Sequence, residues 1–325
     1  MACQSSSRAA QSNIKLQSQL EKTWKKLHDA GTGFRYSLHI ERERLIKGQF
    51  DFLLQLNRQR LTKRRQPQNF QLEAQFDSTK FNFNQVDSSE ILFELAFPTS
   101  TSILINNSPV TLYHSLVVPE REDQRPQLLT PSGIRVAFEL LLRIPDRRYR
   151  VGYNSPGALA SVNHLHLHLL PIHRDLYVQH TELLPVAGVP LLYRLPDEVP
   201  AQGYCLTMHD PTRDLEPVCD GLYTLLKTLL KYRMAHNIFF TWTHIDKSVN
   251  RGAIRVIVYP RVSQCTNKTA CSFNVAFLEL SGFISVGTTY DFDYLTQDTI
   301  IQALREAQGD VYSALQNDFP NNSHS

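Results

Sequence analysis

Cysteine is scarce in this chain of 325 residues. The five cysteines are scattered, odd in number and never in a Cys-x-x-Cys pair; they are Cys3, Cys205, Cys219, Cys265 and Cys271. This pattern argues against a disulfide framework and against a thiolate zinc site, and it is typical of a protein from a reducing compartment. We therefore expect a cytoplasmic location.

Long hydrophobic runs and a strong net charge are also missing. No window approaches the roughly 18 apolar residues that a membrane-spanning helix needs. The N-terminus lacks the apolar segment of a secretory signal, and the acids and lysines that follow residues 1–12 argue against a mitochondrial presequence. The net charge of +3 is too small to indicate nucleic acid or an anionic membrane as the main partner.

The N-terminal segment predicts one amphipathic helix. Residues 1–12 are expected to be disordered, whereas apolar side chains recur at helical spacing over residues 14–30. Gly31 and Gly33 follow, as is typical after the end of a helix. We expect an N-terminal extension with one helix over residues 1–33.

Two stretches of apolar segments and turns predict strands and helices. The first contains EILFELAF, SILI and SLVVP, then a helix capped by Thr130, then RYRVGYN. The second contains a helix over residues 212–236, the strands IFFTWTHI, AIRVIVYP and AFLELSGFISV, and a helix over residues 296–316. SLVVPERE (115–122) and RVIVYPRV (255–262) both end on proline and arginine, which suggests an internal duplication.

A basic run, RQRLTKRR (58–65), holds five basic side chains. A solvated helical face is the favoured interpretation of its composition, and a nuclear signal or a polyanion site are the alternatives.

The segment VNHLHLHLLP (162–171) has a histidine at every second position. Successive side chains of a strand point to opposite faces, so His164, His166 and His168 would share one face, roughly 6.5–7 Å apart. The leucines between them would occupy the other face.

Three interpretations of these histidines compete. Imidazole is a common metal ligand, but the outer rings of a straight strand are too far apart to share an ion. A structural role explains one histidine more readily than three in alternation. The third interpretation is nucleophilic catalysis at phosphorus, in which the central ring attacks and its neighbours donate hydrogen bonds to phosphate oxygens. We favour the third, and expect no metal and no cofactor.

The loop before the histidines suits a phosphate ligand. NSPGALAS (154–161) contains small residues that let the backbone approach a ligand, and its N–H and serine O–H groups can donate to phosphate.

Together these segments resemble the His-φ-His-φ-His-φ-φ signature of the histidine triad superfamily. NNSPVTLYHSLVVP (106–119) is similar to a second landmark of that superfamily, an Asx-x-Ser-Pro turn followed by a histidine and a strand that ends on proline. A closer resemblance, from about residue 35 to 310, is to the GDP-hexose phosphorylases. The segments that carry it are LNRQRLTKRRQPQ, FDSTKFNFNQVDSSEILFEL, YNSPGALASVNHLHLH, AHNIFF, RVIVYPR and FNVAFLELSGF. His168 is similar to the animal branch, whereas the plant branch has glutamine there.

The resemblance implies an α+β, histidine-triad-like fold, in which helices flank an antiparallel sheet. It further implies two fused repeats, the second of them degenerate. We expect the catalytic repeat at residues 34–175, the degenerate repeat at residues 176–316 and a flexible tail at residues 317–325.

The resemblance also implies the reaction: GDP-α-D-glucose and phosphate give α-D-glucose 1-phosphate and GDP. His166 would be the nucleophile and would carry a guanylyl group. His164 and His168 would hold phosphate oxygens or orient the nucleophile, with His114 close by. The implied substrate-binding residues are Asn106 at the ribose, Ser161 at phosphate, and Asn154, Gly157, Arg64 and Arg65. His236, Asn237, Arg255, Arg261 and Asn274 match family segments without an assigned role.

Other functions stay open at this point. A triad hydrolase of dinucleoside polyphosphates or phosphoramidates would use water in place of phosphate, and a nucleotide-sensing protein would bind without turnover. A nucleic-acid binder is disfavoured, because the basic run is short and has no interleaved aromatic residues. The expected partners are GDP-D-glucose and inorganic phosphate, with no nucleic acid and no membrane, and the resemblance allows a homodimer.

Overall fold

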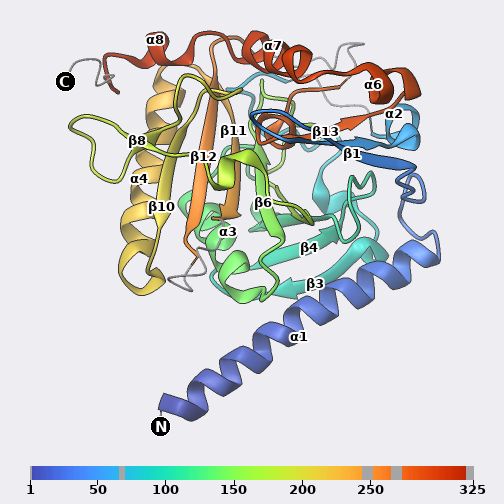
Figure 1. Ribbon diagram of the computed structural model, residues 1–325. Coiled ribbons are helices and arrows are strands. Elements are labelled where there is room, and N and C mark those ends of the chain that lie inside the picture. The colour runs from blue at the N-terminus through green and yellow to red at the C-terminus, as the bar shows by residue number, and fades with distance from the viewer. Residues whose placement is uncertain (1, 66–69, 244–251, 265–272, 320–325) are drawn as a thin grey trace.

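The computed structural model describes residues 2–65, 70–243, 252–264 and 273–319. Within these residues the centre is one sheet of ten antiparallel strands, in the order β3-β4-β5-β7-β6-β11-β12-β10-β9-β8 (Figure 1). Its strands are β3 (Ile91–Leu95), β4 (Thr101–Ile105), β5 (Ser115–Pro119), β6 (Tyr149–Asn154), β7 (Leu167–Pro171), β8 (Leu184–Pro185), β9 (Tyr193–Arg194), β10 (Tyr204–Met208), β11 (Ala235–Trp242) and β12 (Ile254–Arg261).

A second, smaller sheet and a set of helices surround the main sheet. The smaller sheet contains β1 (Arg42–Ile46), β2 (Phe52–Leu56) and β13 (Phe283–Val286). The helices are α1 (Ala2–Asp29), α2 (Arg58–Lys63), α3 (Pro131–Arg143), α4 (Pro211–Lys231), α5 (Phe277–Leu280), α6 (Thr289–Tyr294), α7 (Gln297–Gln308) and α8 (Val311–Leu315). The short 3-10 helices are η1 (Phe83–Gln85), η2 (Ser88–Glu90), η3 (Arg121–Asp123) and η4 (Tyr177–Gln179).

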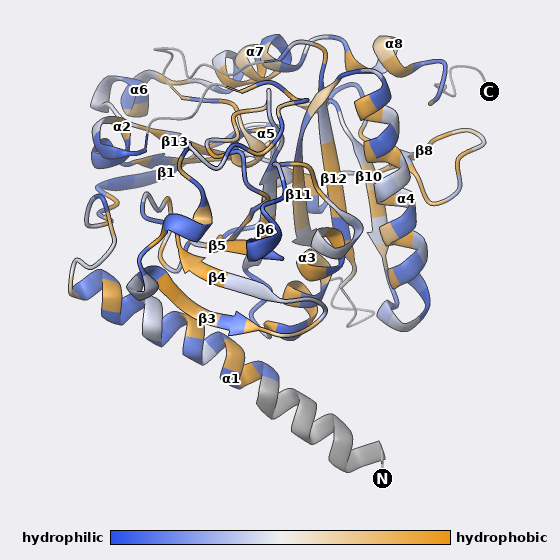
Figure 2. Ribbon diagram, turned by 180° about the vertical axis from the view of Figure 1, so that it is seen from behind, coloured by the Kyte–Doolittle hydropathy of each residue, from blue (hydrophilic) through white to orange (hydrophobic). Residues whose placement is uncertain are grey.

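The two faces of the main sheet pack against different layers. Along β12, Val256 and Val258 join the core beneath α3, α4 and the described part of α1, whereas Ile257 and Tyr259 join a second core with the smaller sheet, α5 and α7. Figure 2 shows the apolar residues of β4, β5 and α3 and the mixed polar and apolar surface of α4. The alternation of side chains in the strands thus builds a three-layer molecule.

The strand order has an internal symmetry. From the central pair outward, one half runs β6, β7, β5, β4 and the other runs β11, β12, β10, β9. In each half a helix, α3 or α4, comes directly before the central strand. This order supports the predicted duplication, whose boundaries stay a prediction. However, residues 115–122 contain β5 and residues 255–262 contain β12, which occupy different positions in the two halves. Their shared Pro-Arg ending therefore does not reflect the duplication.

Most of the predicted elements around the histidines are confirmed. The strands EILFELAF, SILI, SLVVP and RYRVGYN correspond to β3, β4, β5 and β6. Thr130 caps α3, because its hydroxyl accepts a hydrogen bond from the Gly133 N–H at 3.1 Å. Gly31 follows the end of α1 with φ of +67°, and the Thr32 N–H bonds the Leu27 carbonyl across it.

Several predictions for the two ends of the chain need correction. Helix α1 begins at Ala2, so residues 2–12 continue the helix that was expected to start at residue 14. AFLELSGFISV is one short helix, α5, and then β13, separated by Gly282 at φ of +107°. The last helix is interrupted at Gly309, which ends α7 before Asp310 caps α8. Residues 320–325 of the expected flexible tail lie outside the described residues.

Two further observations concern the expected cellular context. None of the described helices is both long and apolar enough to cross a membrane. Cys205 and Cys219 are buried free thiols, and burial raises the pKa of both to about 12.

Candidate active site

A cavity of about 410 Å³ lies between the main sheet and the smaller sheet, next to His166 and His168. Its walls come from α2, the loop between β4 and β5, the residues before β7, and the segment from Phe273 to Asp291. Eight of the residues expected to form the site line it: His114, His166, His168, Asn106, Asn154, Ser161, Arg64 and Arg65. His164 and Gly157 do not.

The three histidines are not all on one strand. Strand β7 begins at Leu167, so only His168 has the predicted alternation with its neighbours. Leu167 and Leu169 enter the core beneath α3, on the face opposite His168. His166 comes just before the strand, and its ring centroid lies 5.4 Å from that of His168, closer than the expected spacing.

His164 is buried outside the cavity. Its Nδ1 accepts a hydrogen bond from the Phe83 N–H at 3.1 Å, and its ring packs edge-on against Phe76. The bend of the chain before β7 turns this side chain away from the face of His168. The His164 side chain is therefore not placed to contact phosphate, and the alternative role, orientation of the nucleophile, falls to its backbone carbonyl, which lies 2.8 Å from Nδ1 of His166.

The tautomer of His166 follows from its contacts. Its Nδ1 lies 2.8 Å from the His164 carbonyl oxygen, which can only accept, so Nδ1 carries the proton. The lone pair of the neutral ring is therefore on Nε2. Burial lowers the pKa of His166 to about 4, so the ring is neutral at pH 7. His166 thus combines an unprotonated ring nitrogen with a place in the cavity wall.

Gln127 fixes the backbone on which His166 stands. Its side-chain oxygen accepts the His166 N–H at 2.8 Å, and its amide N–H groups donate to the carbonyls of His166 and Asn154 at 3.0 and 2.9 Å. Gln127 is fully buried, and the backbone carbonyl of Gln127 accepts a hydrogen bond from the Tyr153 hydroxyl. Sequence alone could not identify this residue, because nothing in the motif marks a loop that lies so far away in the chain.

His114 and His168 form a hydrogen-bonded pair. The Val110 N–H donates to Nδ1 of His114 at 3.2 Å, and Nε2 of His114 lies 3.0 Å from Nδ1 of His168. Burial, with a smaller contribution from the charge of Arg60, holds the pKa of His114 well below its usual range. When His114 donates to His168, the proton of His168 is on Nε2. The indole N–H of Trp24 donates to the His114 carbonyl, so α1 supports this pair.

Space beside His168 depends on Gly152. His168 pairs with Gly152 across β6 and β7. A Cβ at Gly152 would lie 2.2 Å from the ring of Phe277. Without it, the Phe277 ring packs against His168 at a centroid distance of 5.3 Å.

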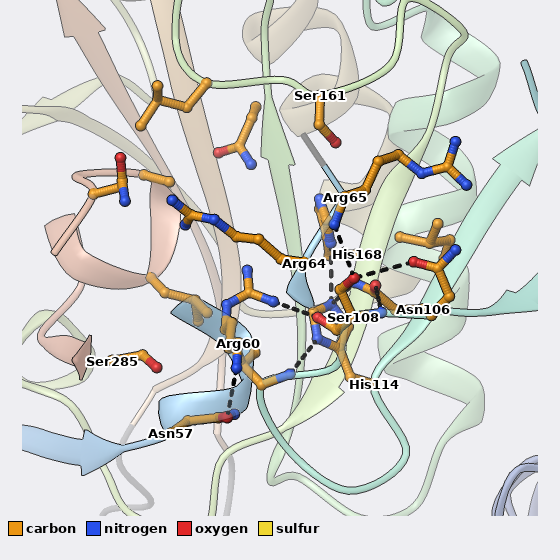
Figure 3. Close-up of a pocket in the computed structure, with 18 of the residues that line it drawn as sticks. Asn57, Arg60, Arg64, Arg65, Asn106, Ser108, His114, Ser161, His168 and Ser285 are labelled. Atoms are coloured by element: carbon orange, nitrogen blue, oxygen red, sulfur yellow. Dashed lines mark hydrogen bonds between the residues drawn. The ribbon is translucent and has the colours of Figure 1, made fainter. Parts of the chain in front are cut away.

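Three arginines bring positive charge to the cavity. Arg60, Arg64 and Arg65 all line it, so the end of the basic run is not a solvated face. The Arg60 guanidinium donates to the Ser108 carbonyl, and the backbone N–H of Arg65 donates to the Ser108 hydroxyl at 3.3 Å. Figure 3 shows the side chains of Arg64 and Arg65 leaving the backbone in opposite directions. With its amide oriented to accept, Asn274 receives bonds of 3.1–3.2 Å from the Arg64 guanidinium.

The remaining predicted residues differ in their surroundings. The Ser161 hydroxyl points into the cavity (Figure 3). Asn106 accepts from the Ser108 N–H at 2.9 Å, and its amide nitrogen lies 3.0 Å from Nε2 of His114. Gly157 has φ of +73°, and a Cβ there would meet Gln264 and Ala235, so it serves the loop conformation.

The second half of the sheet holds the loop of the first half in place. Arg261 donates to the Asn237 side-chain oxygen at 2.9 Å, and Asn237 donates to the side chain of Asn154 and to the Ala158 carbonyl at 2.6 and 2.9 Å. All three side chains are buried. Arg255 donates to the Val178 and Thr181 carbonyls at 3.0 and 2.7 Å, and the backbone N–H of His236 donates to the Ser155 hydroxyl at 2.8 Å. These residues are supports and do not line the cavity, except Asn154.

Metal ligation has no structural counterpart among the described residues, where no three His, Cys, Asp or Glu side chains cluster closely enough to hold an ion. The cavity instead offers neutral imidazoles and arginines. That combination suits an anionic substrate whose phosphorus is attacked by nitrogen.

Comparison of the whole fold with solved structures finds proteins of similar architecture. Yeast Ap4A phosphorylase Apa2, in complex with AMP, matches with a TM-score of 0.67 and 18% identity, over 92% of this chain and 96% of that one. This enzyme belongs to the histidine triad superfamily. The similarity confirms the predicted α+β fold, with its large antiparallel sheet flanked by helices.

Comparison of the sequence gives the family. Residues 15–170 match the family described as GDPGP1-like, N-terminal domain. GDP-D-glucose phosphorylase 1 of Danio rerio is 35% identical, over 86% of this chain and 83% of the relative, and that of Homo sapiens is 33% identical, over 88% and 77%. GDP-L-galactose phosphorylase 1 of Arabidopsis thaliana is 32% identical, over 41% of this chain and 34% of that protein. Since the animal relatives match over most of both lengths, the chain belongs to the GDP-D-glucose phosphorylase family.

Proposed function

We propose that the protein catalyses phosphorolysis of GDP-α-D-glucose, giving α-D-glucose 1-phosphate and GDP. The observation that carries the proposal is the tautomer of His166. Its proton is held on Nδ1 by the His164 carbonyl, so the lone pair on Nε2 is available at the wall of a cavity that three arginines also line. Family membership supports the choice of substrates.

The reaction has two displacements at the α-phosphorus. In the first, His166 Nε2 forms a bond to that phosphorus, and the bond to the bridging oxygen breaks, so glucose 1-phosphate leaves. In the second, an oxygen of inorganic phosphate attacks the guanylyl-histidine, the N–P bond breaks and GDP leaves. Glucose 1-phosphate is a stable anion, so the main demand on the protein is positioning and stabilisation of charge.

His168 and Arg64 are suited to that demand. When Nε2 of His114 donates to Nδ1 of His168, the proton on Nε2 of His168 can be donated to a phosphate oxygen beside His166. Arg64 lines the same cavity and supplies a permanent positive charge. Ser161, whose hydroxyl points into the cavity, is a further donor for the same group.

The two ends of the cavity suit the two ends of the substrate. Asn57, Ser285, Thr288 and Asp291 supply amide, hydroxyl and carboxylate groups at one end. Figure 3 shows Asn57 and Ser285 on the opposite side of the histidines from Asn106. A hexose, with several hydroxyl groups, fits this polar end, which leaves the nucleoside for the end near Asn106.

A trapping experiment tests the proposal. The protein is incubated without phosphate, with GDP-glucose labelled in the guanylyl group, and then digested and analysed by mass spectrometry. We expect label on His166, and its release as GDP when phosphate is added. His166→Asn should carry no label. His173→Asn is the matched control, because His173 is an exposed histidine paired with Glu43 outside the cavity.

Two results would contradict the proposal. The first is an unlabelled protein whose activity survives His166→Asn. The second is release of glucose 1-phosphate at a rate that does not depend on phosphate, which would indicate transfer to water and so the hydrolase alternative.

A cytoplasmic location, a homodimer, and the lack of nucleic-acid and membrane partners are further parts of this proposal. Sedimentation at several protein concentrations would measure the assembly state, and fractionation of cells would measure the location.

A further inference from the structure

One end of the cavity is apolar and aromatic. It is the end beside His166, since the Phe83 ring lies 5.0 Å from the imidazole between centroids. The apolar residues that line the cavity here are Phe81, Phe83, Val86, Leu104, Leu116 and Val162, and they pack as one small cluster. Aromatic side chains of this kind stack on nucleobases, whose faces are flat and apolar. This end therefore fits the base of a nucleotide.

Among the described residues, three carboxylates line the cavity, and each has a partner within the chain. Glu279 accepts the Ala276 N–H at 2.9 Å, and Asp291 accepts the Thr288 hydroxyl at 2.5 Å. Glu90, at the end of η2, is half-buried, and its carboxylate accepts from the backbone N–H of Asp87, the N-cap of η2. Burial raises the pKa of Glu90. A carboxylate has two oxygens with several acceptor sites, so that of Glu90 can also accept hydrogen bonds from a ligand. Among the three, Glu90 is the one that lies next to the aromatic end, beside Val86 and Ile91 of the apolar cluster.

Arg65 lies at the same end as Glu90. Its guanidinium carbon is 3.5 Å from the centroid of the Phe81 ring, and burial is the main cause of a lowered pKa. Its charge acts on Glu90, yet the two side chains form no direct ion pair. Figure 3 shows Arg65 directed to the side of Asn106 and away from Arg64. An acceptor and a donor group therefore lie beside one aromatic slot.

We propose that Glu90 and Arg65 select guanine over other bases. Guanine presents N1–H and N2–H donors on one edge and O6 and N7 acceptors, so a carboxylate can accept from the donors while an arginine donates to the acceptors. Adenine presents an unprotonated N1, which a carboxylate repels. This assignment rests on the proposed function for the nature of the nucleotide. It gives Arg65 a role at the base and leaves the phosphates to Arg64.

Equilibrium binding of GDP and ADP tests the assignment without turnover. Isothermal titration calorimetry on the intact protein would give both affinities for the wild type, Glu90→Gln and Arg65→Gln. A bidentate contact contributes about 1–3 kcal/mol to discrimination, so each variant should lower the ratio of GDP to ADP affinity by about tenfold or more. Glu122→Gln is the control, since Glu122 is exposed in η3 and does not line the cavity.

The ratio separates base selection from other effects. Loss of a negative charge near a diphosphate would strengthen GDP and ADP binding together, and misfolding would weaken both. A ratio in Glu90→Gln within twofold of the wild-type ratio would overturn the assignment of Glu90. Equal weakening of GDP and ADP in Arg65→Gln would assign Arg65 to phosphate instead. Guanine selection that persists in a protein forming no glucose 1-phosphate would refute the reaction but not the base site.

Discussion

Replacement of Gln127 by leucine tests how the nucleophile is positioned. The substitution keeps the size of the side chain but removes its three hydrogen bonds to the backbone of His166 and Asn154. The buried His166 N–H and two carbonyls then lose partners. An unsatisfied buried group costs about 1–3 kcal/mol, so we expect the free energy of unfolding to fall by roughly 3 kcal/mol or more.

Catalysis should suffer beyond this loss of stability. A displacement of about 1 Å of a reacting group can lower a rate by about 100-fold, so kcat of the folded Gln127→Leu protein should fall by about that factor. KM for GDP-glucose should change little, because the arginines and Asn106 of the cavity make no hydrogen bond with Gln127. Urea unfolding and steady-state kinetics at a temperature where the variant is fully folded would measure the two effects separately.

Gln308→Leu is a matched control for Gln127→Leu. Gln308 is also buried, and its amide donates to the Gln202 and Pro260 carbonyls at 2.8 and 3.2 Å, on the far half of the sheet. It should lower the free energy of unfolding and leave kcat unchanged. If both variants kept wild-type kcat, or if both lost it equally while folded, the idea that Gln127 positions His166 would be refuted.

Three further predictions concern titration, charge and the first helix. Burial lowers the pKa of His166 to about 4, so its contribution to stability is present above pH 6.5 and is lost as the pH falls toward 4. In that range the free energy of unfolding of His166→Asn, measured in urea, should change with pH less steeply than that of the wild type, by up to about 1.4 kcal/mol per pH unit. Equal slopes would contradict this. Arg64→Gln should raise KM for GDP-glucose about tenfold, because it removes a positive charge from the cavity. Arg58→Gln should change KM less than about twofold, because it removes only an exposed ion pair with Glu41 outside the cavity. Trp24→Phe should lower the free energy of unfolding by about 1 kcal/mol, because it removes the hydrogen bond to the His114 carbonyl. Trp242→Phe should not, because the buried indole N–H of Trp242 has no partner among the described residues. Thermal melts would compare the two variants.

The fold around the histidines could be predicted because its signals are local. Short apolar runs between turns mark β4 and β5, RYRVGYN marks β6, and Thr130 followed by Pro131 marks the start of α3. The stretch AFLELSGFISV was harder, because a short apolar run fits a buried helix as well as a strand. Its conversion from α5 to β13 depends on Gly282 and on pairing with β2, which is far away in sequence.

The site could be predicted only as far as its motif extends. Alternation placed His168 correctly, but it assumed that the strand also included His164, whose position is set by Phe76 and Phe83. Glu90 and Gln127 reach the cavity and its nucleophile only through the packing of distant segments. No spacing in the sequence relates them to the histidines, and a structure was needed to find them.

The pairing of β6 with β11 determines whether the catalytic half can exist by itself. If residues 34–175 were expressed alone, β6 would lose its pairing with β11 over residues 151–154 and become an exposed edge strand that can aggregate with other chains. This fragment would also lack the hydrogen bonds from Arg261 to Asn237 and from Asn237 to Asn154, together with the cavity wall that β13 and α5 provide. The half of the sheet without the histidine motif therefore supports the site structurally, and a minimal version of this protein must retain it.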